Sequence, residues 1–148
     1  MMDLDDKPLN TFRPLFGGLI SPQPAELNGI FLSRLVGPAW LRTAAPSALA
    51  LGGLGGWLGK EFLLGEQGLN LVQRRGTQKR IFPFLLDYRP SRLDGKPAAV
   101  VCYVRPSPFP WGLIIDELRW LDEQTLLGMT LLKFGPHLAV PFVLQRQA

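Results

Sequence analysis

A Gly-x-Trp-x-Gly string at residues 55–59 constrains the fold of this chain more than any other feature. In a β-rich region, glycines let a strand bend and pack closely against a neighbouring backbone. The tryptophan between them supplies one large indole, which can close one end of a small apolar interior. We therefore expect Gly55, Trp57 and Gly59 to form the structural closure of a small β-barrel.

The chain after Trp57 consists of short apolar runs separated by turn residues, among them Gly65, Gly68 and Asp94-Gly95. This pattern predicts an antiparallel meander, and a meander removes its exposed edges most easily by closing on itself. The predicted fold class is mainly β, an antiparallel up-and-down barrel of about seven to eight strands. We expect strands at residues 57–64, 69–75, 80–88, 97–104, 113–121, 125–134 and 138–146.

The first third of the chain, residues 1–54, is rich in proline, alanine and leucine. Apolar residues recur at helical spacing from Pro24 or Ala25 to Val36, which predicts a helix that Gly37-Pro38 ends. A second short helix is expected at residues 39–51. We expect residues 1–54 to be a helical segment that packs on the barrel or caps it, 55–148 to be the barrel, and both to form a single domain.

The composition is more apolar than that of a typical soluble domain, with 47% hydrophobic and 19% charged residues in a chain of 148. A chain of this length forms one domain with a sizeable core. The apolar surplus therefore predicts either a lined cavity or an oligomer interface.

Positive charge is concentrated in one part of the chain. Residues 74–105 carry eight basic side chains against Asp87 and Asp94, a charge of +6, which leaves −2 for the rest of a chain with net charge +4. Basic residues at strand edges and turns discourage aggregation, so a solvated hairpin edge is the expected role. Attraction of an anionic ligand or surface is an alternative. Without a recognised motif, we expect no nucleic-acid partner.

Three features predict a cytoplasmic protein without a transmembrane segment. The longest charge-free apolar run, residues 43–59, is short and contains Pro46 and several glycines. The acidic beginning of the sequence lacks the pattern of a secretory signal. Cys102 is the single cysteine, which fits a reducing compartment.

The stretch Gly55–Phe62 resembles the signature of a bacterial family named for its GXWXG motif. Residues 92–104, 113–119 and 126–129 resemble the uncharacterised domain that usually follows this motif, so that the resemblance covers residues 45–146. It implies a small lipocalin-like, calycin-type barrel, similar also to fatty-acid-binding proteins. The family brings no established reaction with it.

The resemblance also implies a partner for the motif tryptophan. In lipocalin-like barrels the tryptophan commonly lies under an arginine from the far end of the chain, as a cation on an aromatic face. Arg146 lies in the last predicted strand. We therefore expect the Arg146 guanidinium to cover the Trp57 ring and to help close the barrel.

The chemistry that the sequence offers is centred on Asp116. Strand alternation places Asp116 on one face of its strand, and Glu117 and Arg119 on the other. A buried carboxylate needs a partner that offsets its desolvation. Three roles stay open for Asp116: a paired side chain at the barrel mouth, an anchor for a polar group of a ligand, or a catalytic acid or base. The candidate ligand-binding residues are Lys60, Phe62, Phe84, Tyr88, Tyr103, Asp116, Arg119 and Met129.

The sequence indicates no metal site and no cofactor. Its single histidine, His137, opens the last predicted strand, and haem ligation by its imidazole is an alternative. The count of cysteines and histidines is too low for a closed zinc site. No phosphate-binding loop, dinucleotide fingerprint or nucleophile elbow is present.

The first hypothesis is a binding or carrier protein whose barrel holds a small hydrophobic ligand, fatty-acid-like or isoprenoid-like, with a basic side chain near its polar end. An alternative is a cofactor-free enzyme of the isomerase or cyclase type that uses Asp116 and a cavity tyrosine. A third is a scaffold whose interior is filled by side chains. A homodimer is compatible with each of them.

Overall fold

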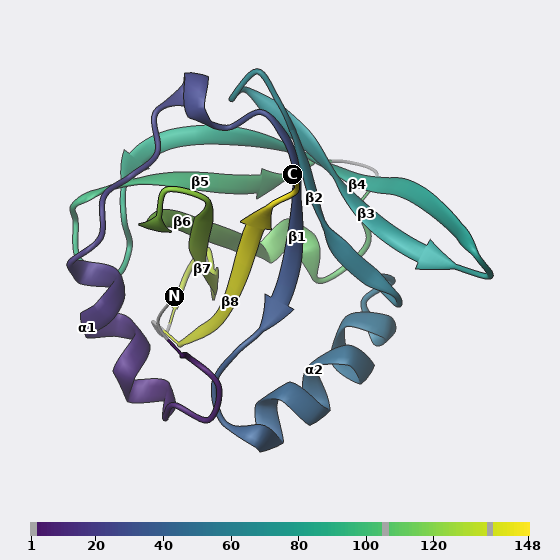
Figure 1. Ribbon diagram of the computed structural model, residues 1–148, viewed down its shortest axis with the longest axis horizontal. Coiled ribbons are helices and arrows are strands. Elements are labelled where there is room, and N and C mark those ends of the chain that lie inside the picture. The colour runs from purple at the N-terminus through teal and green to yellow at the C-terminus, as the bar shows by residue number, and fades with distance from the viewer. Residues whose placement is uncertain (1–2, 105–106, 136–137) are drawn as a thin grey trace.

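The computed structural model describes residues 3–104, 107–135 and 138–148, which contain eight antiparallel strands closed into one barrel (Figure 1). Each strand pairs with the next one along the chain, and β1 pairs with β8. This confirms the predicted up-and-down barrel. The strands are β1 (Gly29–Leu35), β2 (Trp57–Leu63), β3 (Gln67–Arg74), β4 (Thr77–Pro90), β5 (Pro97–Tyr103), β6 (Ile114–Asp122), β7 (Thr125–Leu132) and β8 (Ala139–Arg146).

The helix predicted from residue 24 or 25 to residue 36 is wrong, because Gly29–Leu35 forms the strand β1. Only Pro24–Glu26 forms a turn of 3-10 helix, η2. Without β1, the outer edges of β2 and β8 would carry unpaired backbone groups, and β1 pairs with both. Barrel closure therefore overrides the helical spacing of the apolar residues. The boundary expected at residue 54 does not separate a helical part from the barrel.

The second predicted helix is confirmed as α2 (Ala39–Leu51). The other helical elements are short: η1 (Leu9–Thr11) directly precedes α1 (Phe12–Gly17), and η3 (Trp111–Leu113) directly precedes β6. Figure 1 shows α1 and α2 on different sides of the barrel. They also differ in packing: α1 buries Phe12 and Phe16, whereas no residue of α2 is fully buried.

Two separate hydrophobic clusters explain why several strands are apolar on both faces. The interior cluster includes Phe31, Phe62 and Phe84. The outer cluster lies between the barrel wall and the N-terminal segment, where Phe12 and Phe16 pack with residues such as Val143. The N-terminal segment thus supplies an outer cover, one of the two placements expected for it.

The hairpin between β3 and β4 projects beyond the barrel (Figure 1). Residues 73–80 are all exposed and include four of the basic side chains. Arg80 pairs with Glu61, and Arg74 donates to the carbonyl oxygens of Gly53 and Gly55. This part of the basic stretch is therefore a solvated hairpin edge, as expected.

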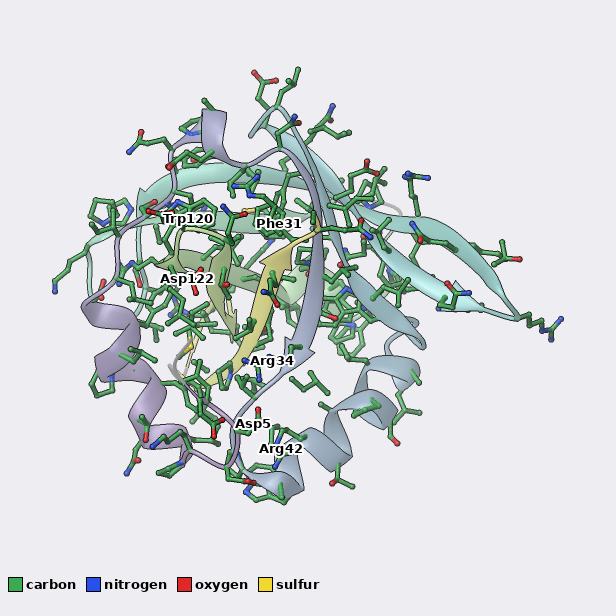
Figure 2. All side chains as sticks on the ribbon, viewed as in Figure 1. Asp5, Phe31, Arg34, Arg42, Trp120 and Asp122 are labelled. Atoms are coloured by element: carbon green, nitrogen blue, oxygen red, sulfur yellow. The ribbon has the colours of Figure 1, made fainter. Side chains whose placement is uncertain are left out.

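Salt bridges join the N-terminal segment to the chain around β1 and α2. Figure 2 labels Asp5, Arg34 and Arg42 in this region. Arg34 Nη1 donates to Asp5 Oδ1 at 2.9 Å, and Arg42 pairs with Asp6. Arg42 Nε also donates to the Gly37 carbonyl oxygen at 3.1 Å. These contacts hold the first turns of α2 against the end of β1.

Candidate functional site

A cavity of about 530 Å³ lies at the end of the barrel where β2 and β8 begin, and α2 forms one of its walls. Helix α2 contributes Leu41, Ala45 and Leu49, and the barrel contributes Trp57 and Phe142. Most of the lining is apolar. Small-molecule sites in proteins have volumes of roughly 300–1,000 Å³, so the cavity is of ligand-binding size.

The cavity has one polar wall, formed by Asp116, Tyr103 and Thr130 from three neighbouring strands. Asp116 lies opposite Thr130 in the β6–β7 register and opposite Val101 in the β5–β6 register. Paired residues share a face of the sheet, and Tyr103 follows Val101 by two positions, so all three polar side chains point inward. The Tyr103 hydroxyl donates to Asp116 Oδ2 at 2.6 Å, and the Thr130 hydroxyl donates to Asp116 Oδ1 at 2.7 Å.

Lys60 completes this network from the other side of the barrel. Its side chain is 1% exposed, and its Nζ lies 3.2 Å from Asp116 Oδ2. The ammonium group also donates to the Tyr103 oxygen at 2.7 Å and to Asn70 Oδ1 at 2.9 Å. Three aromatic rings surround the charge, because Nζ lies 5.0 Å from the centroid of Phe84, 4.9 Å from that of Tyr103 and 5.6 Å from that of Trp57.

Burial shifts two pKa values in this network. Desolvation lowers the pKa of Lys60, and the charge of Asp116 and its hydrogen bond act in the opposite direction. The pKa of Tyr103 is raised well above its usual value, first by burial and then by the neighbouring Asp116 carboxylate. Tyr103 therefore remains protonated at neutral pH and acts as a hydrogen-bond donor.

The structure brings five of the predicted site residues together at this end of the interior. Tyr103, Asp116 and Trp57 line the cavity, and Lys60 and Phe84 lie directly behind them. Phe62 packs deeper in the interior, edge to face with Phe84. Tyr88 lies outside the cavity lining, and its hydroxyl donates to the Gly65 carbonyl oxygen at 2.6 Å. Burial raises the pKa of Tyr88 to about 12.

Two predicted ligand-binding residues, Arg119 and Met129, do not face the cavity. Arg119 Nη1 and Nη2 bind the Asp94 carboxylate at 2.6 and 2.8 Å, and the guanidinium lies 4.2 Å from the Phe16 ring centroid. Met129 packs in the outer cluster and lies opposite Glu117. The physical reason is strand alternation, which places these residues on the face opposite Asp116.

The predicted contact between Arg146 and Trp57 is wrong. The Arg146 guanidinium lies 4.7 Å from the Phe31 ring centroid and 5.6 Å from that of Trp120, and Figure 2 labels both rings. The cation beside Trp57 is Lys60. Because β1 separates β2 from β8 and is antiparallel to both, β2 and β8 run in the same direction. Trp57 begins β2 whereas Arg146 ends β8, so the two residues lie at opposite ends of the barrel.

The glycines of the motif region have different roles. Gly59 has φ +155°, and a Cβ there would overlap the Phe31 carbonyl oxygen, so close packing of β1 on β2 requires glycine. Gly56, at the unspecified second position of the motif, has φ +76°, and a Cβ there would overlap the Gln73 carbonyl oxygen. Gly55 has no such close backbone contact. Its carbonyl oxygen accepts a hydrogen bond from Arg74.

Sequence reasoning missed the apolar lining from α2 and β8 and, on the remaining wall, Asn70, Thr130 and Trp111. Asn70 lies opposite Lys60 in the β2–β3 register and accepts hydrogen bonds from Lys60 and Trp57. Thr130 binds Asp116, and Trp111 lines the cavity. The available signal for Asn70 was a single polar residue inside the apolar run 69–72. The signal for Thr130 was similar, because it interrupts an apolar run at 126–132.

Metal binding and membrane crossing can be assessed for the described residues. In that part of the chain, no group of three or more histidine, cysteine, aspartate or glutamate side chains could hold a metal ion. No helix within it has the length and hydropathy needed to span a membrane. His137 lies outside the described residues, so the structure does not test haem ligation.

Comparison with known proteins supports the fold. No family model and no curated protein matches the chain. A crystal structure of a protein from Thermomonospora curvata is similar, with 19% sequence identity and a TM-score of 0.73. The match covers 97% of this chain and 90% of that chain. At this identity the likeness shows a shared fold, and the site chemistry has to be argued from the side chains themselves.

Proposed function

We propose that this protein binds a small hydrophobic molecule in the cavity between α2 and the barrel. The observation that carries the proposal is an apolar cavity of about 530 Å³ with polar side chains on one wall. Small-molecule sites typically combine an apolar lining with a few polar groups that orient the ligand. The cavity also accounts for part of the apolar surplus of the composition, because apolar residues line it instead of filling it.

Membership of the GXWXG family is part of this proposal. The motif stretch supports it, because Trp57 begins β2 of a closed barrel and also lines the cavity. In this view the motif tryptophan belongs to the ligand-binding end of the barrel. The cytoplasmic location expected from the sequence stays a prediction, and a homodimer stays compatible with the proposal.

The proposal can be tested by filling the cavity. Ala45 lines the cavity from α2, whereas its neighbour Ala44 is exposed and outside the lining. Ala45→Trp should abolish binding of an apolar fluorescent dye, and Ala44→Trp should bind it like the wild type. Native mass spectrometry of the purified wild type should show added mass from a co-purified ligand. Equal dye binding by Ala45→Trp and the wild type would contradict the proposal.

A second candidate is a cofactor-free isomerase or cyclase that uses Asp116 and Tyr103. The observation that favours it is a carboxylate and a protonated phenol on the wall of an apolar cavity, 2.6 Å apart. Such a pair could move a proton at a bound substrate. Asp116→Asn would then retain ligand binding and lose turnover, whereas in a carrier the same variant would alter binding alone.

A further inference from the structure

The hydrogen-bonding state of the polar wall restricts which ligand can bind there. The described lining residues with side-chain donors are Trp57, Tyr103, Trp111 and Thr130. Trp57 Nε1 donates to Asn70 Oδ1 at 3.1 Å, and Trp111 Nε1 donates to the Gly52 carbonyl oxygen at 2.7 Å. Tyr103 and Thr130 both donate to Asp116. Each of these donors is therefore already used within the protein.

Among the described residues, the ammonium group of Lys60 beside this wall is used in the same way. An ammonium group has three protons, and Lys60 directs its own toward Asn70, Tyr103 and Asp116. Its side chain is 1% exposed, and it is not part of the cavity lining. The basic side chain expected near the polar end of the ligand is thus turned toward protein groups and has no proton left for a ligand.

Acceptor capacity remains on the same wall. A carboxylate accepts about four hydrogen bonds, and Asp116 receives one from Tyr103 at Oδ2 and one from Thr130 at Oδ1, in addition to its ion pair with Lys60 at Oδ2. The Thr130 hydroxyl donates its proton to Asp116, and its oxygen keeps its lone pairs as acceptors. In the part of the chain that the structure describes, the wall therefore offers acceptors to a ligand and no free side-chain donor.

The charge of the ligand's head group limits further which ligands can bind. A ligand carboxylate would lose its hydration in this cavity and would gain no counter-charge from Lys60, which is already paired with Asp116. A ligand ammonium would lie close to Lys60, which already neutralises Asp116. A neutral group that donates a hydrogen bond avoids both penalties.

We propose that the ligand of this cavity is a hydrophobic alcohol, whose hydroxyl donates a hydrogen bond to Asp116 or Thr130 while its apolar part fills the space beneath α2. This inference rests on the proposed binding function and replaces the fatty-acid-like ligand with a neutral hydroxyl-bearing one. An isoprenoid-like alcohol belongs to the same class.

Four probes of equal chain length test the head group: decan-1-ol, its methyl ether, decanoate and decylamine. The affinity of each probe is measured by its displacement of an apolar fluorescent dye from the wild-type protein at pH 8, where decanoate is ionised. We expect decan-1-ol to bind about tenfold more tightly than its methyl ether, the scale of one hydrogen bond to a charged acceptor. The ether is the decisive comparison, because it is neutral and more apolar than the alcohol but has no proton to donate.

Two variants separate head-group recognition from general affinity. Asp116→Asn replaces the charged acceptor with a neutral amide that has one acceptor oxygen, so the ratio between the affinities for the alcohol and the ether should fall toward one. Leu49→Ala removes apolar lining, so both affinities should fall and their ratio should stay about tenfold. If Asp116→Asn does not fold, the affinities of the four probes for the wild type and for Leu49→Ala still show whether the head group must donate a hydrogen bond.

The outcomes distinguish the inference from the function on which it rests. Binding of the ether, decanoate or decylamine as tightly as the alcohol would overturn the inference and leave the binding function intact. Failure of all four probes to displace the dye would overturn the proposed function and the inference with it.

Discussion

Lys60 Nζ lies 3.2 Å from Asp116 Oδ2 inside the barrel, and the side chains are 1% and 3% exposed. The two residues come from β2 and β6, which are not neighbours in the barrel. Their charges meet across the interior and compensate each other where water is excluded. A buried pair of this kind tolerates joint replacement much better than the loss of one partner.

The first prediction concerns this pair. Lys60→Met and Asp116→Leu should each lower the free energy of unfolding by about 3–5 kcal/mol, because each leaves an uncompensated buried charge. The double variant should be much closer to the wild type than the sum of the two losses. Urea denaturation of the four proteins measures the coupling. Strictly additive losses would show that the ion pair is energetically unimportant.

The second prediction concerns the close contact of β1 and β2 at Gly59. Gly59→Ala places a Cβ against the Phe31 carbonyl oxygen at a residue with φ +155°, so strands must move apart. We expect a loss of about 3 kcal/mol or more in the free energy of unfolding. Gly112→Ala is the matched control, because a Cβ there meets nothing within 4 Å. Similar melting curves for the two variants would refute the role of Gly59.

The third prediction concerns Arg119, which lies outside the cavity. Its guanidinium binds both oxygens of Asp94 and the carbonyl oxygens of Phe16, Lys96 and Pro97. Arg119→Lys loses the planar fork and should lower the free energy of unfolding by about 2 kcal/mol. Dye binding by the folded variant should remain unchanged. Weaker dye binding with unaltered stability would instead restore Arg119 as a ligand contact.

The fourth prediction concerns acid stability. The hydrogen bond from Arg119 is the main cause that lowers the pKa of Asp94 from 3.8 to about 2. Because the folded state binds this proton less readily than the unfolded state, the stabilisation is complete above about pH 4 and is lost as the pH falls toward 2. The free energy of unfolding should therefore fall more steeply over this range in the wild type than in Asp94→Asn. Parallel pH profiles would contradict this assignment.

The local sequence pattern was sufficient to predict most strands of the barrel. Turn residues and apolar runs after Trp57 predicted β2 to β8 to within three residues at each end. Alternation within one strand also predicted that Asp116 would face away from Glu117 and Arg119, and the structure confirms it. These features depend on neighbours in the sequence, since a strand presents successive side chains to opposite faces.

The missing strand shows where local pattern fails. Residues 29–35 carry apolar side chains at helical spacing, and only the unpaired edges of β2 and β8 make them a strand. The contact between Arg146 and Trp57 was expected from the family resemblance, and β1 also explains why it is wrong. Because β1 separates β2 from β8, these two strands run in the same direction and the two residues lie at opposite ends of the barrel. Register around a closed barrel depends on every strand that it contains.

The sequence by itself determined the barrel class, strands β2 to β8 with their turns, and the placement of Asp116 on the face opposite Glu117 and Arg119, because these follow from periodicity and turn chemistry. Only the tertiary structure decided that Lys60, Asn70, Tyr103, Asp116 and Thr130 form one network, since these five residues come from five different strands. It also decided that the donors of the polar wall are already used. That property depends on distances between residues remote in sequence, and it is the property that selects the ligand we propose.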